Sequence, residues 1–156
     1  MKIYTLRKEQ QLPIPLIEAW DFFSNPANLA AITPPQLGFR VTSQLPAKMY
    51  AGMIVTYRVT PLAGVPVTWV AEITHAEEPV RFVDEQRFGP YRFWHHQHEF
   101  REIPGGTEMR DLVHYALPRA AGPFGWFVNR WIVGRQLATI FSYRKGVLEE
   151  RFGRMP

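Results

Sequence analysis

Residues 89–118 read GPYRFWHHQHEFREIPGGTEMRDLVHYALP and contain two strand-like runs separated by a glycine-rich turn. Every second residue of the first run lies on one face: Trp94, His96, His98 and Phe100. The matching positions of the second run are Met109, Asp111, Val113, Tyr115 and Leu117. Successive side chains of a strand point to opposite faces, so each set shares a face. That face is mostly apolar yet carries histidines and an aspartate, which predicts buried polar groups that need partners or a ligand.

The turn between the two runs sets their register. If residues 103–106 form the loop, Glu102 pairs with Thr107 and His98 lies opposite Asp111. Directly opposite side chains on one face interact, so this register predicts a cross-strand His–Asp pair.

A second turn, over residues 89–91, connects the first run to the strand before it. A three-residue loop there sets Asp84 opposite His96, whereas a two-residue loop would turn the strand over. The three-residue loop is favoured because it places Phe82, Trp94 and Phe100 on one buried side. It also predicts one polar patch formed by Asp84, Gln86, His96, His98, Asp111 and Tyr115.

Outward from this hairpin, Gly and Pro divide the chain into short strand-like runs. We expect strands near 2–12, 38–46, 52–60, 65–75, 80–88, 92–102 and 107–117. A short amphipathic helix is expected from Pro15 to Asn25, with one further helical turn over 27–32. The connections within 38–117 are too short for crossovers, so strands adjacent in sequence are predicted to be adjacent in an antiparallel sheet.

The chain ends in a long amphipathic pattern over 125–151. Its apolar stripe is expected to contain Phe127, Trp131, Leu137, Phe141 and Leu148. The other faces are marked by Arg130, Gln136, Arg144, Glu149 and Glu150. Gly134 lies within this helix, where glycine is unfavourable, and so indicates close packing or room for a ligand.

Together these elements predict a single α+β domain over 1–156. The expected architecture is a seven-stranded curled antiparallel sheet wrapped around a long C-terminal helix, with two short helices between the first and second strands. A curved sheet that grips a helix leaves a gap between them, and apolar ligands occupy such gaps.

Composition limits the function classes. The chain has no Cys, which excludes disulfides and a thiol nucleophile. Its net charge is +4, but the arginines are scattered rather than clustered, so no nucleic-acid partner is expected. The sequence shows no signal-peptide pattern and no run long enough to span a membrane, which favours a cytoplasmic protein.

The element order and hairpin resemble the SRPBCC superfamily, the helix-grip proteins that include START lipid-transfer domains and polyketide cyclase/dehydrase-like proteins. The most specific part is G-P-x-x-x-W-x-H-x-H-x-F over 89–100, followed by G-G-T over 105–107 and D-x-V-x-Y-x-L-P over 111–118. The N-terminal segment with Asn25-Pro26 and Thr33-Pro34-Pro35 is similar to the same small stand-alone proteins. The resemblance implies a fold and a cavity, and leaves the activity open.

We therefore expect a hydrophobic or aromatic small molecule, lipid- or polyketide-like, to bind between sheet and helix, with no cofactor. The expected ligand-binding residues are Trp69, Phe82, Asp84, Gln86, Trp94, His96, His98, Phe100, Met109, Asp111, Val113, Tyr115, Trp131 and Phe141.

Two other functions stay open. A cyclase or dehydratase would use His96 or His98 as the base, Asp84 or Asp111 to orient it and Tyr115 at the oxyanion. A membrane- or protein-associating adaptor would use Trp126 and Phe127 as an exposed apolar lip. The HxH spacing of His96 and His98 also matches metal ligation, but the motif is weak alone, so no metal is expected.

Overall fold

The computed structural model describes residues 1–62 and 64–156. Seven antiparallel strands form one sheet in the order β1-β7-β6-β5-β4-β3-β2. The strands are β1 (Tyr4–Leu12), β2 (Arg40–Val41), β3 (Met53–Leu62), β4 (Val65–Glu77), β5 (Arg81–Phe88), β6 (Phe93–Ile103) and β7 (Gly106–Ala116). From β2 to β7, neighbours in sequence are neighbours in the sheet, as the short loops predict. The first strand, β1, pairs with β7 and forms one edge of the sheet, with Leu6 opposite Val113.

The second strand is much shorter than predicted. Only Arg40 and Val41 have strand geometry, whereas a strand over 38–46 was expected. Thr42 still donates its backbone N–H to Thr56 O at 2.8 Å, and Ser43 Oγ accepts from Thr56 N at 3.0 Å. A side-chain acceptor has replaced a backbone partner there, which ends the regular ladder.

The two hairpins have the predicted registers. His98 pairs with Asp111 across β6 and β7, and Asp84 pairs with His96 across β5 and β6. The turn after β6 is tighter than expected, because Ile103 pairs with Gly106 and leaves two residues in the loop. Gly105 follows Pro104 and has a φ of 83°, the positive value that the second loop residue of a type II turn requires.

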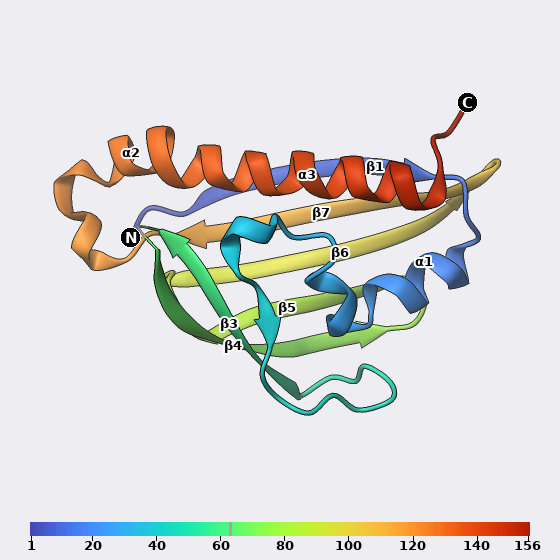
Figure 1. Cartoon of the computed structure of the whole chain (residues 1–156), viewed down its shortest axis with the longest axis horizontal. Helices are drawn as coiled ribbons and strands as arrows, with labels where there is room; N and C mark the ends of the chain where they lie inside the picture. Colours follow the sequence, from blue (N-terminus) through green and yellow to red (C-terminus); the bar gives the residue numbers. More distant parts are fainter. Residues whose placement is uncertain (63) are drawn as a thin grey trace.

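Irregular pairing between β4 and β5 bends the sheet. The register shifts between Val70 and Ala71 and again between Ile73 and His75. Bulges of this kind increase the local twist and curve the strand. The sheet therefore curls over the elements that lie on its concave face, as Figure 1 shows.

Three short helices lie between β1 and β2. The first is α1 (Leu16–Phe23), followed by the 3-10 turns η1 (Pro26–Leu29) and η2 (Pro35–Leu37). Helix α1 buries Ala19, Trp20 and Phe22. The ring of Trp20 meets Phe82 and Phe100 edge-on, at centroid distances of 5.9 and 6.0 Å. These contacts fix α1 on the concave face of the sheet.

The C-terminal helical region has four segments. A 3-10 segment η3 (Arg119–Phe124) leads into α2 (Gly125–Val128), the π-helical η4 (Asn129–Val133) and α3 (Gly134–Phe152). Helix α3 runs over β1 and beside β7 in Figure 1, and it contacts β1. The π turn was not predicted: Gly134 N–H bonds to Asn129 O, five residues back. A Cβ at Gly134 would lie 2.8 Å from that oxygen, so the glycine permits a close backbone approach.

The π turn changes which residues face the sheet. Leu137, Phe141 and Leu148 are buried as predicted, but Trp131 and Phe127 are 51% and 55% exposed. A π turn adds a residue to one turn and rotates the preceding segment by roughly 100° relative to a regular helix. The expected apolar stripe is therefore wrong before residue 133 and correct after it.

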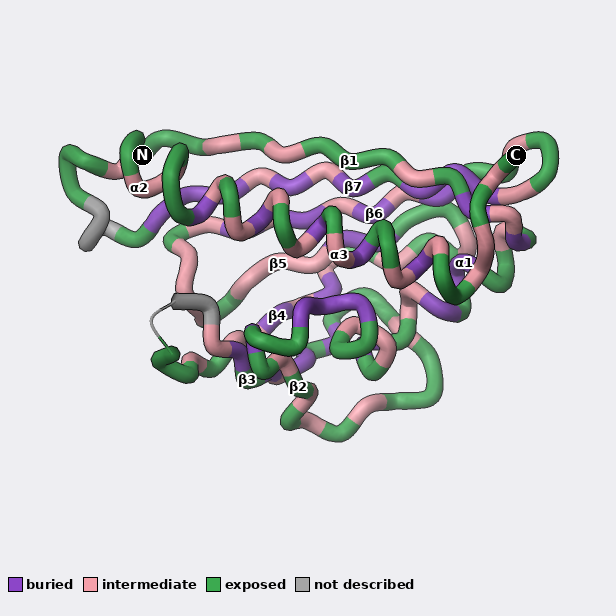
Figure 2. Tube along the Cα trace, turned by 45° about the horizontal axis from the view of Figure 1, so that its top comes forward, coloured by how far each residue is buried: buried purple, intermediate pink, exposed green. Residues whose placement is uncertain are grey.

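Two hydrophobic clusters share the interior. The first joins α1 to the sheet and contains Leu12, Trp20, Met109 and Leu148. The second, which includes Trp94, Val113, Leu137 and Phe141, joins β6 and β7 to the C-terminal helix. Figure 2 shows buried segments along the central strands and exposed ones along β1 and the outer loops. Among the described residues, no helix is long and apolar enough to span a membrane.

Candidate functional site

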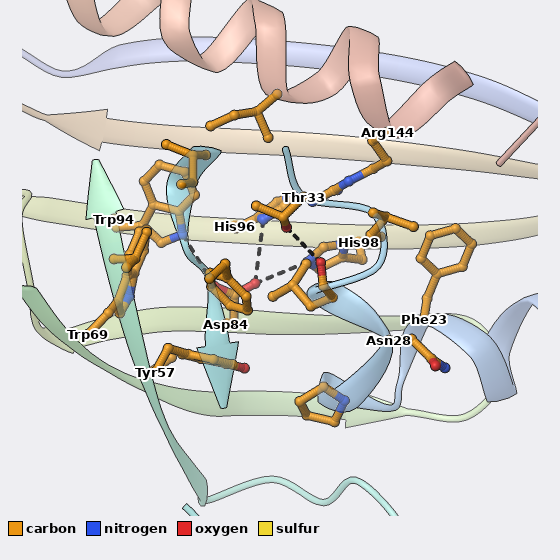
Figure 3. A pocket seen from close by; sticks show the side chains of 18 of the residues that line it. Phe23, Asn28, Thr33, Tyr57, Trp69, Asp84, Trp94, His96, His98 and Arg144 are labelled. Carbon is orange, nitrogen blue, oxygen red and sulfur yellow. Dashed lines mark hydrogen bonds and ion pairs between the residues drawn. The ribbon is translucent and has the colours of Figure 1, made fainter. Parts of the chain in front are cut away.

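A cavity of about 150 Å³ lies between the concave face of the sheet, the η1–η2 segment and α3. Aromatic and aliphatic side chains from β3 to β6 form its wall, including Tyr57, Trp69 and Trp94. Leu137, Ile140 and Phe141 line it from α3. Figure 3 shows the labelled aromatic residues around a small polar group formed by Asp84, His96 and His98.

Two histidines and two aspartates form a closed polar cluster at one wall of this cavity. His96 Nε2 lies 2.8 Å from Asp111 Oδ1, and its Nδ1 lies 3.5 Å from Asp84 Oδ2. His98 Nε2 lies 3.0 Å from Asp84 Oδ2, and its Nδ1 lies 3.0 Å from Asp111 Oδ1. Each imidazole thus bridges both carboxylates, and the two rings are 3.7 Å apart between centroids.

The strand pairing explains this arrangement. His96 and His98 are two residues apart on β6 and therefore point to the same face. Asp84 lies beside them on β5, and Asp111 lies on the other side on β7. Trp94 Nε1 also donates to Asp84 Oδ1 at 3.2 Å, which adds a third donor to that carboxylate.

The two histidines have opposite pKa shifts. Burial lowers the pKa of His96, and the neighbouring charge of His98 lowers it further, against the pull of the aspartates. Burial also disfavours charged His98, but Asp111 and Asp84 outweigh it and raise the pKa of His98. Burial opposes ionisation of Asp84 and Asp111, yet their contacts with the imidazoles lower both carboxyl pKa values. Of the two imidazoles, His98 therefore holds a proton more readily than His96.

Arg144 supplies a positive charge from the helix side. Its side chain is 8% exposed, its Nη1 lies 3.6 Å from Asp111 Oδ1, and its guanidinium carbon lies 4.8 Å from the ring centroid of Phe141. Its Nε is buried without a hydrogen-bond partner. The sequence pattern placed Arg144 and Gln136 on outer faces, but both line the cavity. A long charged side chain on an amphipathic helix is usually solvated, so periodicity alone gave no signal for Arg144.

The structure brings half of the predicted binding residues to the cavity wall. They are Trp69, Phe82, Asp84, Trp94, His96, His98 and Phe141. Asp111 is 7% exposed and sits behind the histidines rather than on the wall. Phe100, Met109 and Val113 are buried in the two hydrophobic clusters, where they pack rather than line the cavity.

Three predicted residues have other positions. Gln86 braces the 89–91 turn, donating to Tyr91 O at 2.6 Å and accepting from Tyr91 N at 3.2 Å. Tyr115 donates its hydroxyl to Asn129 Oδ1 at 2.9 Å and is not among the residues that line the cavity. Trp131 lies at the surface because of the π turn.

Sequence reasoning missed several residues that line the cavity, most of them outside the hairpin. They include Phe22, Asn28, Ile32, Thr33, Phe39, Tyr57 and Tyr91. Tyr57 alternates with buried Val55 and Val59 on β3, a signal that was available from the strand pattern. The η1–η2 residues have no periodic signal, because their placement depends on how that segment folds over the sheet.

These features define a helix-grip fold with an internal cavity and a buried polar cluster on its wall. Solved structures confirm the fold. The protein TTHA0849 from Thermus thermophilus has a TM-score of 0.69 and 19% identity, over 96% of this chain and 97% of that one. Ara h 8.0201 has a TM-score of 0.61 and 14% identity, over 96% and 99%.

A third similar structure is a di-domain aromatase/cyclase, BexL of the BE-7585A biosynthetic pathway. It has a TM-score of 0.70 and 18% identity, over 99% of this chain and 51% of that one. No family model matches this chain, and no curated protein matches it significantly. The chain therefore shares its fold with these proteins, and at this level of identity the likeness shows the fold alone.

Proposed function

We propose that this protein binds an apolar small molecule, with an aromatic ring or a ring-sized end, in the cavity between the sheet and α3. The observation that carries the proposal is the cavity itself, which combines a mostly apolar wall with one convergent polar cluster. Binding sites for small molecules have this composition: apolar surface provides affinity and a few polar groups provide orientation.

The size of the cavity limits the ligand. Its volume of about 150 Å³ is similar to that of an engineered apolar cavity that binds benzene. One aromatic ring therefore fits without rearrangement, whereas a longer lipid- or polyketide-like molecule would place only one end inside. Trp69 and Trp94, whose rings meet edge-on at 5.1 Å, offer such a ring an aromatic contact.

Titration calorimetry with phenol and 1-naphthol tests the proposal. We expect saturable binding of one equivalent, with quenching of tryptophan fluorescence from Trp69 and Trp94. Ala71→Leu fills space at the wall, because Ala71 is 3% exposed and lines the cavity. Binding should weaken at least about tenfold, since the lost volume excludes the ring.

Ala51→Leu is the matched control, because Ala51 is exposed in a turn away from the cavity. It should bind both probes like the parent protein. Ile140→Trp fills the cavity from α3 and provides a second test if Ala71→Leu folds poorly. Equal binding by the parent protein and by both filled variants would show that the probes do not bind in the cavity.

A second candidate function is contact with an anionic membrane surface, supported by one exposed apolar cluster. The cluster, here called the lip, consists of Phe124, Trp126, Phe127, Trp131 and Ile132, each at least 46% exposed. Arg130 and Arg135 flank it, with their guanidinium carbons 5.7 and 4.4 Å from the ring of Trp131. Aromatic residues next to cations are typical of interfacial contacts.

Cosedimentation with phosphatidylserine vesicles tests this second function. Binding should fall with added salt and with the double variant Trp126→Ser, Phe127→Ser. Phe88→Ser is the control, because Phe88 is 66% exposed but lies on β5, outside the lip. If both variants sediment equally with vesicles, the lip is not the contact surface.

A further inference from the structure

Three potential metal ligands converge at the cavity wall. Asp84 on β5 and the pair His96 and His98 on β6 offer one ligand atom each, and these atoms all lie within 4.8 Å of one another. Asp84 Oδ2 lies 3.5 Å from His96 Nδ1 and 3.0 Å from His98 Nε2. Figure 3 draws both of these contacts as dashed lines from the Asp84 carboxylate.

These separations fit a first-row transition metal. Ligands bound tetrahedrally at about 2.1 Å are about 3.4 Å from one another. The two distances from Asp84 differ from this value by less than about half an ångström. An ion could therefore replace the direct contacts between carboxylate and imidazoles with small side-chain movements.

The far side of the histidines is arranged as a metal site requires. His96 Nε2 makes its 2.8 Å contact with Asp111 Oδ1, which leaves Nδ1 to face Asp84. His98 Nε2 faces Asp84, and its Nδ1 lies 3.0 Å from Asp111 Oδ1, within ion-pair distance but without hydrogen-bond geometry. Metal-bound imidazoles usually donate their other N–H to a carboxylate, which fixes the ring and its tautomer.

The charge of the cluster also favours a cation. When both imidazoles are neutral, the two carboxylates outnumber the guanidinium of Arg144 by one charge. Among the described residues that line the cavity, Arg144 is the one lysine or arginine. Its guanidinium lies near Asp111. A buried excess of negative charge is unfavourable, so the cluster needs either a proton or a metal ion.

We propose that Asp84, His96 and His98 bind one divalent transition-metal ion such as Zn²⁺ or Fe²⁺, with Asp111 as the residue that positions both imidazoles. Two imidazoles and one carboxylate suit these ions, whereas Mg²⁺ and Ca²⁺ prefer oxygen ligands throughout. Because all three ligands line the cavity, the remaining coordination positions face it and are open to water or to an oxygen atom of a ligand. This site does not depend on whether an apolar molecule occupies the cavity.

The test uses the full chain, stripped with EDTA and titrated with Zn²⁺ or Co²⁺. We expect one equivalent to bind, with intense visible Co²⁺ bands typical of four or five ligands. His98→Gln should weaken binding at least about a hundredfold, and Asp111→Asn about 10- to 100-fold. His75→Gln should bind like the parent protein, since His75 is exposed on β4, opposite Val83 and outside the cluster.

Nitrogen-15 NMR of the histidine side chains tests the site in the unmodified protein, so the result does not depend on variants that fold. Zn²⁺ should shift Nδ1 of His96 and Nε2 of His98 while leaving His75 unchanged. Absence of stoichiometric binding, or shifts confined to other histidines, would overturn the proposal. Equal affinity in His98→Gln and the parent protein would overturn it as well.

Discussion

The carboxylate of Asp111 contacts the imidazole of His96 diagonally across two strands, with Oδ1 2.8 Å from Nε2. In the register of the sheet, His96 lies opposite Val113, and Asp111 lies opposite His98. Diagonal neighbours on one face of a sheet are within reach of long side chains. One carboxylate therefore serves both histidines, although the register alone predicts a single pair.

Removing the charge of Asp111 should strongly destabilise the metal-free protein. Asp111→Asn leaves the imidazoles and Arg144 with an uncompensated buried charge, so we expect a loss of about 3–5 kcal/mol in the free energy of unfolding. Urea denaturation in EDTA measures it. Glu9→Gln is the control: Glu9 pairs with Arg110 but is 64% exposed, and its loss should cost less than about 1 kcal/mol. Similar losses in both variants would contradict a buried network.

Stability of the metal-free protein should depend on pH through His98. The pKa of His98 is raised in the folded state. Its protonation therefore contributes fully to the free energy of unfolding below the unfolded-state pKa of about 6.5, and this contribution is lost as pH rises through the folded-state pKa. The slope is at most about 1.4 kcal/mol per pH unit for one proton. Urea denaturation across this range should show the parent protein losing stability toward alkaline pH and His98→Gln losing less. Parallel curves would show that His98 does not gain a proton on folding.

The sequence predicts the hairpin half of the site well and the helix half poorly. Short loops and a period of two leave few registers, so the alignment of His96 with Asp84 followed from the position of one turn. Nothing in the pattern reveals that Arg144 turns inward, because a buried arginine depends on Asp111 and on the ring of Phe141. The sequence pattern does not reveal the position of Thr33 on the cavity wall either, because it depends on the path of η1 and η2 over the sheet.

The π turn explains the other main difference and leads to a prediction about the helix surface. Leu137 is 3% exposed and Trp131 is 51% exposed, although one apolar stripe was expected to include both. Leu137→Ala should therefore destabilise the protein by about 2–5 kcal/mol. Trp131→Ala should change the free energy of unfolding by no more than about 1 kcal/mol. Thermal and urea unfolding measure both, and an equal large loss would place Trp131 in the core.

Alanine substitutions at Gly134 and Gly146 should have opposite effects on stability. Alanine normally favours a helix over glycine by about 1 kcal/mol. At Gly146, within α3, an added Cβ meets nothing within 4 Å, so Gly146→Ala should stabilise the protein by up to that amount. At Gly134 the Cβ would lie 2.8 Å from Asn129 O, so the π turn must open or shift.

Gly134→Ala should therefore destabilise the protein despite the better helix propensity of alanine. Asn129 Oδ1 also accepts the hydroxyl of Tyr115, so a shifted π turn should disturb that hydrogen bond as well. Urea denaturation gives the two free energies, and the near-ultraviolet circular dichroism of Tyr115 and its neighbours reports the local change. If Gly134→Ala stabilises as much as Gly146→Ala, the segment forms a regular α-helix in solution and Trp131 turns toward the sheet.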